Sequence, residues 1–337
     1  MRLIPASLPT RRLFASLGLL FAAASMPALA ETHPGQGQLV SEVARDTGKD
    51  PQALNSLLDG AKMQQSILDA ISRPAEAKPW RDYRPIFLTP QRINDGIAFY
   101  REHRELLERI GQQYGVAPEY IVAIIGVETS YGRNTGKYKV LDALVTLGLY
   151  YPPRATFFRD QLKTLLELPD SQLAGPVDTL TGSYAGAQGW GQFMPSSIRD
   201  FGVDADGDGR IDLKNSLPDI FASIANYFAK HGWQAGGPVA ARAQADGAAR
   251  AISVKDSKPQ WPVEQLEAWG YAPLQHMNPG QPSSLQSLDG ADGMEYWFTF
   301  QNFYVITTYN RSPLYALAVH QLAQAIAEGA GVSESTQ

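Results

Sequence analysis

The sequence predicts a mainly α-helical protein with a smaller α+β part near its end. Apolar residues recur at helical spacing through much of residues 39–230 and again at 312–329. The best strand candidates instead lie together, within residues 235–309. The chain has 337 residues, 44% of them hydrophobic, which is enough for a sizeable core in one large domain or two to three lobes.

Residues 1–30 are predicted to be a secretory signal peptide. Arginines precede the apolar run LFASLGLLFAAAS, which is too short to span a bilayer, and Ala28–Ala30 supplies the small residues of a cleavage site. A disordered apolar tail or a membrane anchor is the alternative. The sequence contains no cysteine, so we expect neither disulfides nor an acylated cysteine. This predicts a soluble protein, periplasmic if the signal is bacterial, and not an integral membrane protein.

Residues 31–80, together with 310–330, are predicted to form a helical lobe. The segment from Leu39 to Ile71 has helical spacing with a break at Gly48–Pro51, and Asp50-Pro51 is a helix start signal. Residues 72–90 are proline-rich, which predicts an extended connection.

Residues 81–234 are predicted to form the central part of the protein. The expected helices cover 91–114, the segment that starts at Pro118, 138–149, 155–167 and 218–230. Between them, residues 181–194 contain too many glycines and aromatics for a regular element, which is typical of a loop near a ligand. Residues 235–309 are predicted to form a small α+β lobe. Its strand candidates are EYWFTF and NFYVITT, and we expect a hairpin near its end.

One carboxylate continues an apolar helical stripe in EYIVAIIGVETSYGRN. Ile121, Ile124, Ile125 and Glu128 stand at i, i+3, i+4 and i+7. A buried carboxyl has a raised pKa, which suits a group that donates and accepts a proton near neutral pH. The alternative is a helix whose last turn reaches the surface, with Glu128 in water.

The segment VDADGDGRIDLKNSLPD is predicted to bind a cation, because its aspartates have the spacing of an EF-hand loop. Position 12 is Asn215 instead of glutamate, and Asp219 could close the site from the next helix. A helix cap with Ser216 is the alternative for Asp219, and a solvated acidic turn for the whole loop. Oxygen ligands without histidine indicate a structural Ca²⁺, with Na⁺ as the second choice. The predicted metal residues are Asp204, Asp206, Asp208, Arg210 and Asp219.

Charge and motifs exclude several other functions. Signal cleavage would remove three arginines and no acid, leaving 26 basic against 34 acidic residues, which argues against a nucleic-acid partner. The histidines are scattered, and no GxSxG or HExxH motif is present.

Several segments resemble the lytic murein transglycosylase B family, over roughly residues 36–330. They are GVETSYG (126–132), SYAGAQGWGQFMPSS (183–197), DADGDGRIDL (204–213), ANYFAKHGW (225–233) and TTYNRSPLYALAV (307–319). The resemblance implies a lysozyme-like α+β catalytic core in residues 81–234 and peptidoglycan glycan strands as substrate. Other cell-wall enzymes are possible partners by the same resemblance.

The resemblance also implies residue roles. Glu128 matches a single catalytic glutamate that protonates the oxygen between N-acetylmuramic acid and N-acetylglucosamine. It then takes the O6 proton, so that O6 closes on C1 and gives a 1,6-anhydro end. The implied substrate-binding residues are Ser183, Gln192, Tyr227, Tyr309, Asn310, Tyr315 and Tyr83. For the tyrosines, core packing with a satisfied hydroxyl is the alternative.

This sequence departs from the family pattern in two places. Phe157 stands where a cleft tyrosine is expected, and Asp219 aligns with the last cation ligand only if one residue is inserted before it. Two other functions stay open: a hydrolytic muramidase on the same fold, and a cell-wall-binding protein without activity. Analysis of the reaction products separates the first from a transglycosylase.

Overall fold

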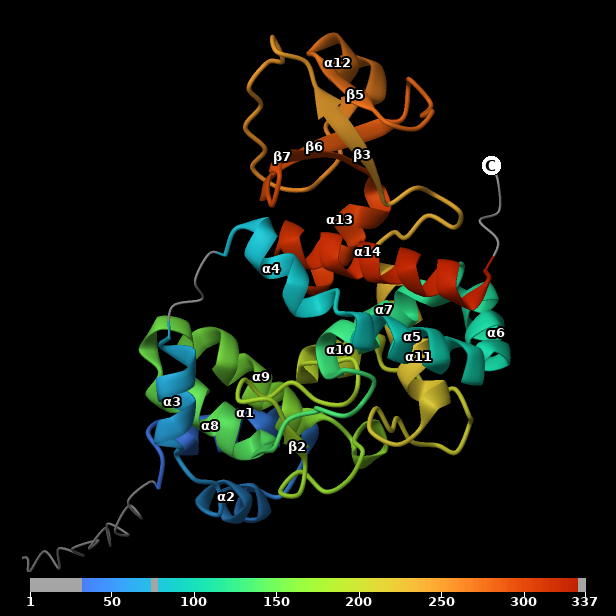
Figure 1. Cartoon of the computed structure of the whole chain (residues 1–337). Coiled ribbons are helices and arrows are strands. Elements are labelled where there is room, and N and C mark those ends of the chain that lie inside the picture. Colours follow the sequence, from blue (N-terminus) through green and yellow to red (C-terminus); the bar gives the residue numbers. More distant parts are fainter. Residues whose placement is uncertain (1–31, 74–77, 333–337) are drawn as a thin grey trace, which may run out of the picture. The chain divides into compact units, whose positions relative to one another are not determined.

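The computed structural model describes residues 32–73 and 78–332, so the predicted signal peptide lies outside the described residues. The described chain begins with helices α1 (Gln36–Thr47), α2 (Pro51–Asp59) and α3 (Gln65–Ile71). The start signal at Asp50-Pro51 is confirmed, because the Asp50 carboxylate accepts the Gln52 N–H at 3.0 Å as the N-cap of α2. Helix α1 contacts α2 and α9, and α3 contacts α8 (Figure 1).

Eight helices make up the central part of the described chain. They are α4 (Trp80–Phe87), α5 (Pro90–Glu102), α6 (Arg104–Tyr114), α7 (Pro118–Thr129), α8 (Val140–Tyr150), α9 (Ala155–Glu167), α10 (Pro195–Phe201) and α11 (Leu217–Lys230). Short elements join them: β1 (Tyr138–Lys139) pairs antiparallel with β2 (Thr181–Gly182), and 3₁₀ turns cover Pro152–Arg154 and Asp170–Gln172. Helix α7 contacts α5, α6, α11 and α14, which makes it the centre of the larger core.

Two expectations for residues 72–114 are wrong. The proline-rich segment contains helix α4, because Pro79 sits at the N-cap, where its missing N–H needs no partner, and Trp80 is almost fully buried. The single helix expected at 91–114 is two helices, α5 and α6, that meet at His103. The backbone of His103 leaves the helical region (φ −108°, ψ 16°), so the two helices can run in different directions and each can pack on the core.

The small lobe contains a five-stranded antiparallel sheet with strand order β4-β6-β7-β3-β5. The elements are β3 (Ala240–Ala245), β4 (Trp261–Pro262), α12 (Val263–Ala268), β5 (Tyr271–Pro273), β6 (Pro282–Gly290) and β7 (Gly293–Thr299). A separate hydrophobic cluster packs this lobe, with Val263, Leu266 and Phe298 at its centre. The hairpin therefore joins β6 to β7.

NFYVITT forms a helix, so the strand prediction for this segment is wrong. The chain continues as α13 (Gln301–Tyr309) and α14 (Pro313–Ala330). Phe303 and Ile306, at i and i+3, are buried, and the Asn302 amide donates to the carbonyls of Gln234 and Gly237. These contacts exist only in the folded chain, and they override the preference of the β-branched residues for strands.

Helix α14 makes its main contacts with α4, α5, α7 and α13 (Figure 1). The grouping of residues 310–330 with the amino-terminal helices differs from this packing, and the boundaries of the expected lobes stay predictions. Among the described residues, no helix has both the length and the apolar character needed to cross a membrane.

Candidate active site and cation loop

Helix α7 carries Glu128 in its last turn. More of this helix is buried than the expected apolar stripe, because every residue from Tyr120 to Val127 is buried, as is Thr129. Pro118 begins the helix as expected, since a proline at the first helical position loses no hydrogen bond. Glu128 alone in this stretch keeps partial exposure. The carboxylate thus stands where a fully packed helix reaches an opening.

The surroundings of Glu128 favour its protonated form. Burial raises the pKa of Glu128 to about 7, although the Tyr315 hydroxyl donates to its Oε1 at 2.6 Å and acts in the opposite direction. Burial and then the Glu128 charge raise the pKa of Tyr83, Tyr309 and Tyr315. Among the described residues, Glu128 is the only carboxylate whose charge acts on all three tyrosines. The Tyr315 hydroxyl is hydrogen-bonded to this acid, and Tyr83 and Tyr309 lie within reach of its charge.

A strained turn follows Glu128. Ser130 (φ 52°), Tyr131 (φ 61°) and Gly132 (φ 79°) are all left-handed, which costs about 1–3 kcal/mol for each non-glycine residue. A Cβ on Gly132 would come within 2.3 Å of the Trp190 ring. The backbone therefore turns sharply out of α7 and lets the indole of Trp190 lie against it.

Thr129 fastens this turn to the glycine-rich loop. Its buried hydroxyl donates to the Trp190 carbonyl at 3.0 Å and accepts the Gly132 N–H at 3.1 Å. From the other side, Arg92 donates to the Ser130 hydroxyl at 3.0 Å. Sequence reasoning did not single out Thr129 or Arg92. In the sequence, Thr129 is marked only by its position directly after Glu128, and Arg92 is not marked at all.

Ser183 and Gln192 lie in the glycine-rich loop, and both shape it. The Ser183 hydroxyl accepts the N–H groups of Ala185 and Ala187. Gln192 is left-handed (φ 54°), and its amide donates to the carbonyls of Thr135 and Gly189 at 3.2 and 2.9 Å. The two side chains hold the loop, and both keep partial exposure.

The tyrosines differ in their surroundings. The Tyr309 hydroxyl donates to the Gly191 carbonyl at 2.5 Å, which links α13 to the glycine-rich loop. Tyr227 is only 8% exposed, and its hydroxyl donates to the Thr308 carbonyl at 2.7 Å, so core packing accounts for most of this residue. Tyr83 is partly exposed and packs beside Trp80. Asn310 is exposed at the end of α13.

The structure thus places Tyr315 against Glu128 and brings Tyr83 and Tyr309 within reach of its charge, and Tyr309 joins α13 to the glycine-rich loop at Gly191. Phe157, at the position where a cleft tyrosine is expected, is 41% exposed, and its ring centre lies 4.9 Å from the Arg154 guanidinium. A phenylalanine there offers a face for an apolar sugar surface but no hydroxyl.

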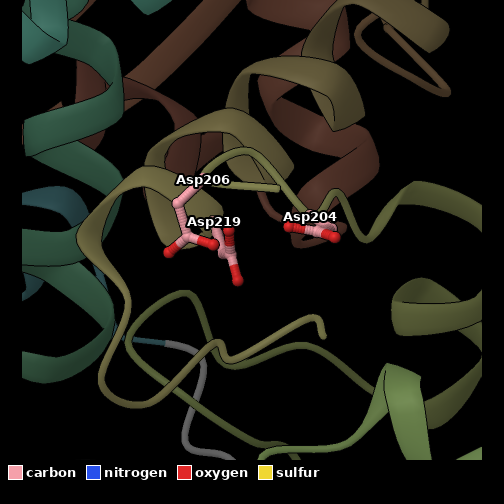
Figure 2. A group of neighbouring side chains, drawn as sticks. All are labelled: Asp204, Asp206 and Asp219. Atoms are coloured by element: carbon pink, nitrogen blue, oxygen red, sulfur yellow. The ribbon is translucent and has the colours of Figure 1, made fainter. Parts of the chain in front are cut away.

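The aspartate loop brings three carboxylates together. Oxygens of Asp204, Asp206 and Asp219 lie within 4.8 Å of one another, and Figure 2 shows Asp206 beside Asp219 with Asp204 facing them. Gly207 and Gly209 are left-handed, and their N–H groups donate to Asp204 at 2.8 Å. Convergent oxygens on a tight glycine-containing loop suit a hard cation such as Ca²⁺.

Asp219 tests most directly whether the loop suits a cation. It is 1% exposed, and its two oxygens accept the N–H groups of Ala205 and Asp212 at 2.8 Å. Burial and the Asp206 charge raise the pKa of Asp219, which is the expected cost of packing carboxylates together without a cation. Ser216 caps α11 by accepting the Asp219 N–H, so a capping contact and a cation ligand are compatible here.

Asp208 and Arg210 lie outside the group of three carboxylates. Asp208 accepts the Arg210 N–H at 2.8 Å. The Arg210 guanidinium donates to the carbonyls of Asp170 and Leu173, which attaches the loop to the segment after α9.

Comparison of the sequence with known proteins finds a matching family and a relative. The sequence model of a family described as "Transglycosylase SLT domain" matches residues 33–324. Membrane-bound lytic murein transglycosylase B of Escherichia coli (strain K12) is 41% identical over 307 residues, which cover 88% of this chain and 83% of that protein.

Solved structures agree. The soluble lytic transglycosylase SltB1 from Pseudomonas aeruginosa is 47% identical with a TM-score of 0.83, and the match covers 89% of this chain and all of that one. The Escherichia coli lytic transglycosylase Slt35, solved in complex with calcium, is 40% identical with a TM-score of 0.81, over 89% of this chain and 94% of that one. The predicted lysozyme-like transglycosylase fold is confirmed.

Proposed function

Since this chain belongs to the transglycosylase SLT domain family, we infer that it is a lytic transglycosylase that cleaves peptidoglycan, and we propose Glu128 as its catalytic acid. The observation that supports this role is a carboxyl at the end of a buried helix, whose pKa burial raises to about 7 and which accepts a hydrogen bond from the Tyr315 hydroxyl. A carboxyl with that pKa is partly protonated near neutral pH, as a general acid must be.

The proposed reaction needs one carboxyl used twice. Protonated Glu128 gives its proton to the glycosidic oxygen, and the bond from that oxygen to C1 of the muramic acid residue breaks. The resulting carboxylate takes the proton of the O6 hydroxyl, and O6 bonds to C1, so a 1,6-anhydro end forms without water. Two-carboxylate glycosidases instead need a second acid as nucleophile or base. The one-acid scheme is supported by the single carboxylate that Tyr315 contacts and whose charge acts on Tyr83 and Tyr309.

The tyrosines are proposed to keep the acid ready for both steps. Tyr315 donates to Oε1, so it stabilises the carboxylate after the proton has left, while burial favours the protonated form before the reaction. Tyr83, Tyr309 and Asn310 would contact the sugars, together with Ser183 and Gln192 of the glycine-rich loop.

The test compares Glu128→Gln with Glu119→Gln. Glu119 lies in the first turn of the same helix, and burial also raises its pKa, so it is a matched control nine residues away. We expect Glu128→Gln to lower the cleavage rate by roughly 10²–10⁴-fold and Glu119→Gln to remain active. Mass spectrometry of wild-type products should show 1,6-anhydro ends that borohydride does not reduce.

Reducible ends would instead assign the chain to the hydrolytic muramidases. A Glu128→Gln variant as active as the wild type would remove Glu128 from the mechanism. Binding to purified sacculi without cleavage by the wild type would leave a wall-binding protein.

A calcium ion is proposed for Asp204, Asp206 and Asp219, with Asp208 and Arg210 as further members of the loop and Na⁺ as the alternative ion. The calcium complex of Slt35 supports this choice for a relative. Calcium bound by oxygens would supply charge compensation and hold the loop to α11, and no step of the reaction needs it.

The site of action is proposed to be the periplasm, after removal of the predicted signal peptide. The E. coli relative is described as membrane-bound, whereas this sequence has no cysteine to carry a lipid anchor. Contacts with other cell-wall enzymes remain part of the proposal.

A further inference from the structure

A basic pocket lies where the segment between α2 and α3 meets β1. It has a volume of about 320 Å³, and Lys62, Lys137 and Lys139 line it together with Tyr138 and Asp142. We call it the lysine pocket. Its three lysines come from two segments that are about 75 residues apart in the sequence. The fold therefore gathers them, since the sequence shows no basic run.

The lysine pocket has an unbalanced positive charge. All three lysines are exposed. None of them takes part in a salt bridge with another described residue, although the chain as a whole carries a formal charge of −5. Asp142 does line the pocket, but it is 6% exposed and its oxygens accept the Lys62 N–H and the Gln64 amide, both at 3.0 Å. Three ammonium groups and one carboxylate leave a formal charge of +2 on this concave surface, which favours an anionic ligand.

The lysine pocket adjoins the loop proposed to face the sugars. Tyr138 and Lys139 pair with Gly182 and Thr181, directly before Ser183. Gly136 (φ 93°) packs so closely that a Cβ there would lie 2.5 Å from the Ser183 nitrogen. The Gln192 amide also donates to the Thr135 carbonyl, so the segment that carries two of the lysines is fixed to both loop residues.

We propose that the lysine pocket binds carboxylates of the short peptides attached to the glycan strand. This inference rests on the proposed function, because it takes peptidoglycan as the substrate. The amino sugars of such a strand are uncharged where the lactyl group is amide-linked to a peptide, so the negative charge is on the peptides. A pocket of this size holds one or two peptide residues, and exposed ammonium groups pair with carboxylates without the cost of burying charge.

The experiment changes all three lysines, as Lys62→Gln, Lys137→Gln and Lys139→Gln together. Two substrates are compared: soluble glycan strands that carry peptides, and the same strands after an amidase has removed the peptides. The amidase leaves a lactyl carboxylate on each muramic acid, so the second substrate keeps negative charge on the glycan and lacks only the peptide carboxylates. We expect KM for the peptide-bearing strands to rise about tenfold, as three exposed ion pairs would give, with kcat unchanged. KM for the peptide-free strands should stay the same. Added salt should raise the wild-type KM for peptide-bearing strands and have little effect on the variant.

The matched control is the triple variant Lys78→Gln, Lys230→Gln and Lys258→Gln. It changes the net charge equally at exposed lysines outside the pocket and should behave as the wild type. An equal rise in KM on peptide-free strands, or an equal rise in KM in the control variant, would overturn the proposal. So would an unchanged KM accompanied by weaker sedimentation with phosphatidylglycerol vesicles, which would assign the pocket to a lipid surface. Failure of the wild type to cleave either substrate would instead reject the proposed function.

Discussion

At the scale of single residues, Glu128 is the group proposed to carry the chemistry of this protein. Glu128 stands at the end of a helix whose other central residues are buried, and burial brings its pKa to about 7. Tyr315 opposes that shift through a hydrogen bond of 2.6 Å to Oε1. A carboxyl with a pKa of about 7 can donate a proton and accept one near neutral pH, as the proposed mechanism requires.

Removing the Tyr315 hydroxyl should move the pH profile. The hydrogen bond favours the carboxylate, so Tyr315→Phe raises the pKa of Glu128 further above its present value. In the proposed mechanism the reaction starts from protonated Glu128, so activity should be lost as pH rises through that pKa. We therefore expect the alkaline limb of kcat/KM to move to higher pH, with a lower maximum because the carboxylate loses its donor.

Tyr271→Phe is the control for this measurement. The Tyr271 hydroxyl donates to the Arg250 carbonyl in the small lobe, and its ring packs in the core of that lobe. Its pH profile should match that of the wild type. An alkaline limb that stays in place in Tyr315→Phe, or moves to lower pH, would contradict the assignment of that limb to Glu128.

At the scale of elements, the end of α7 and the glycine-rich loop act as one unit. Thr129 joins them, Arg92 holds the turn from α5, and Tyr309 reaches the loop from α13. The left-handed residues at 130 and 131 show that this turn is held against its local preference. The position of the acid relative to the loop thus depends on contacts between elements.

Thr129→Val should loosen this unit. Valine has a similar shape but no hydroxyl, so the Gly132 N–H and the Trp190 carbonyl lose their partner. We expect the free energy of unfolding to fall by about 2 kcal/mol, measured by urea denaturation. We also expect kcat to fall at least tenfold with little change in KM, because displacement of the acid affects the chemical step.

Thr129→Ser tests the hydroxyl separately. It keeps the donor and loses one methyl group, so kcat should recover most of its wild-type value. If serine and valine lower kcat equally, then packing of the methyl group, and not the hydrogen bonds, positions the acid.

Periodicity and helix end signals predicted most of the helices. The predictions failed where a segment fits more than one pattern. Pro118 and Asp50-Pro51 mark real helix starts, since their effects are local. NFYVITT fits both a strand and a helix by its apolar residues, and contacts of Asn302 and Phe303 with distant segments select the helix. The helix α4 within the proline-rich segment depends in the same way on the burial of Trp80.

At the scale of the whole molecule, the aspartate loop joins segments that are distant in sequence. Asp219 of α11 receives N–H groups from both ends of the loop, and Arg210 attaches the loop to the carbonyls of Asp170 and Leu173. A cation at the three carboxylates would stabilise this junction without contacting Glu128.

Removal of the cation should lower stability more than it lowers the rate per folded molecule. For calcium at about a hundred times its Kd, chelation should lower Tm by roughly 5–10 °C. The rate at 25 °C should change little. Asp219→Asn should abolish the calcium dependence of Tm, and Asp200→Asn, an exposed acid paired with Arg199, should retain it. A rate lost on chelation at unchanged Tm would indicate a catalytic ion.

The sequence alone determined the helical class, the position of the acid and the spacing of the aspartates, because these follow from local periodicity and from short motifs. It also carried the family resemblance. Only the tertiary structure decided the pKa of Glu128, its hydrogen bond from Tyr315, and the approach of Asp219 to Asp204 and Asp206. It also decided the gathering of Lys62 with Lys137 and Lys139. The physical reason is that desolvation and charge interaction depend on distances between atoms, and long-range packing sets those distances.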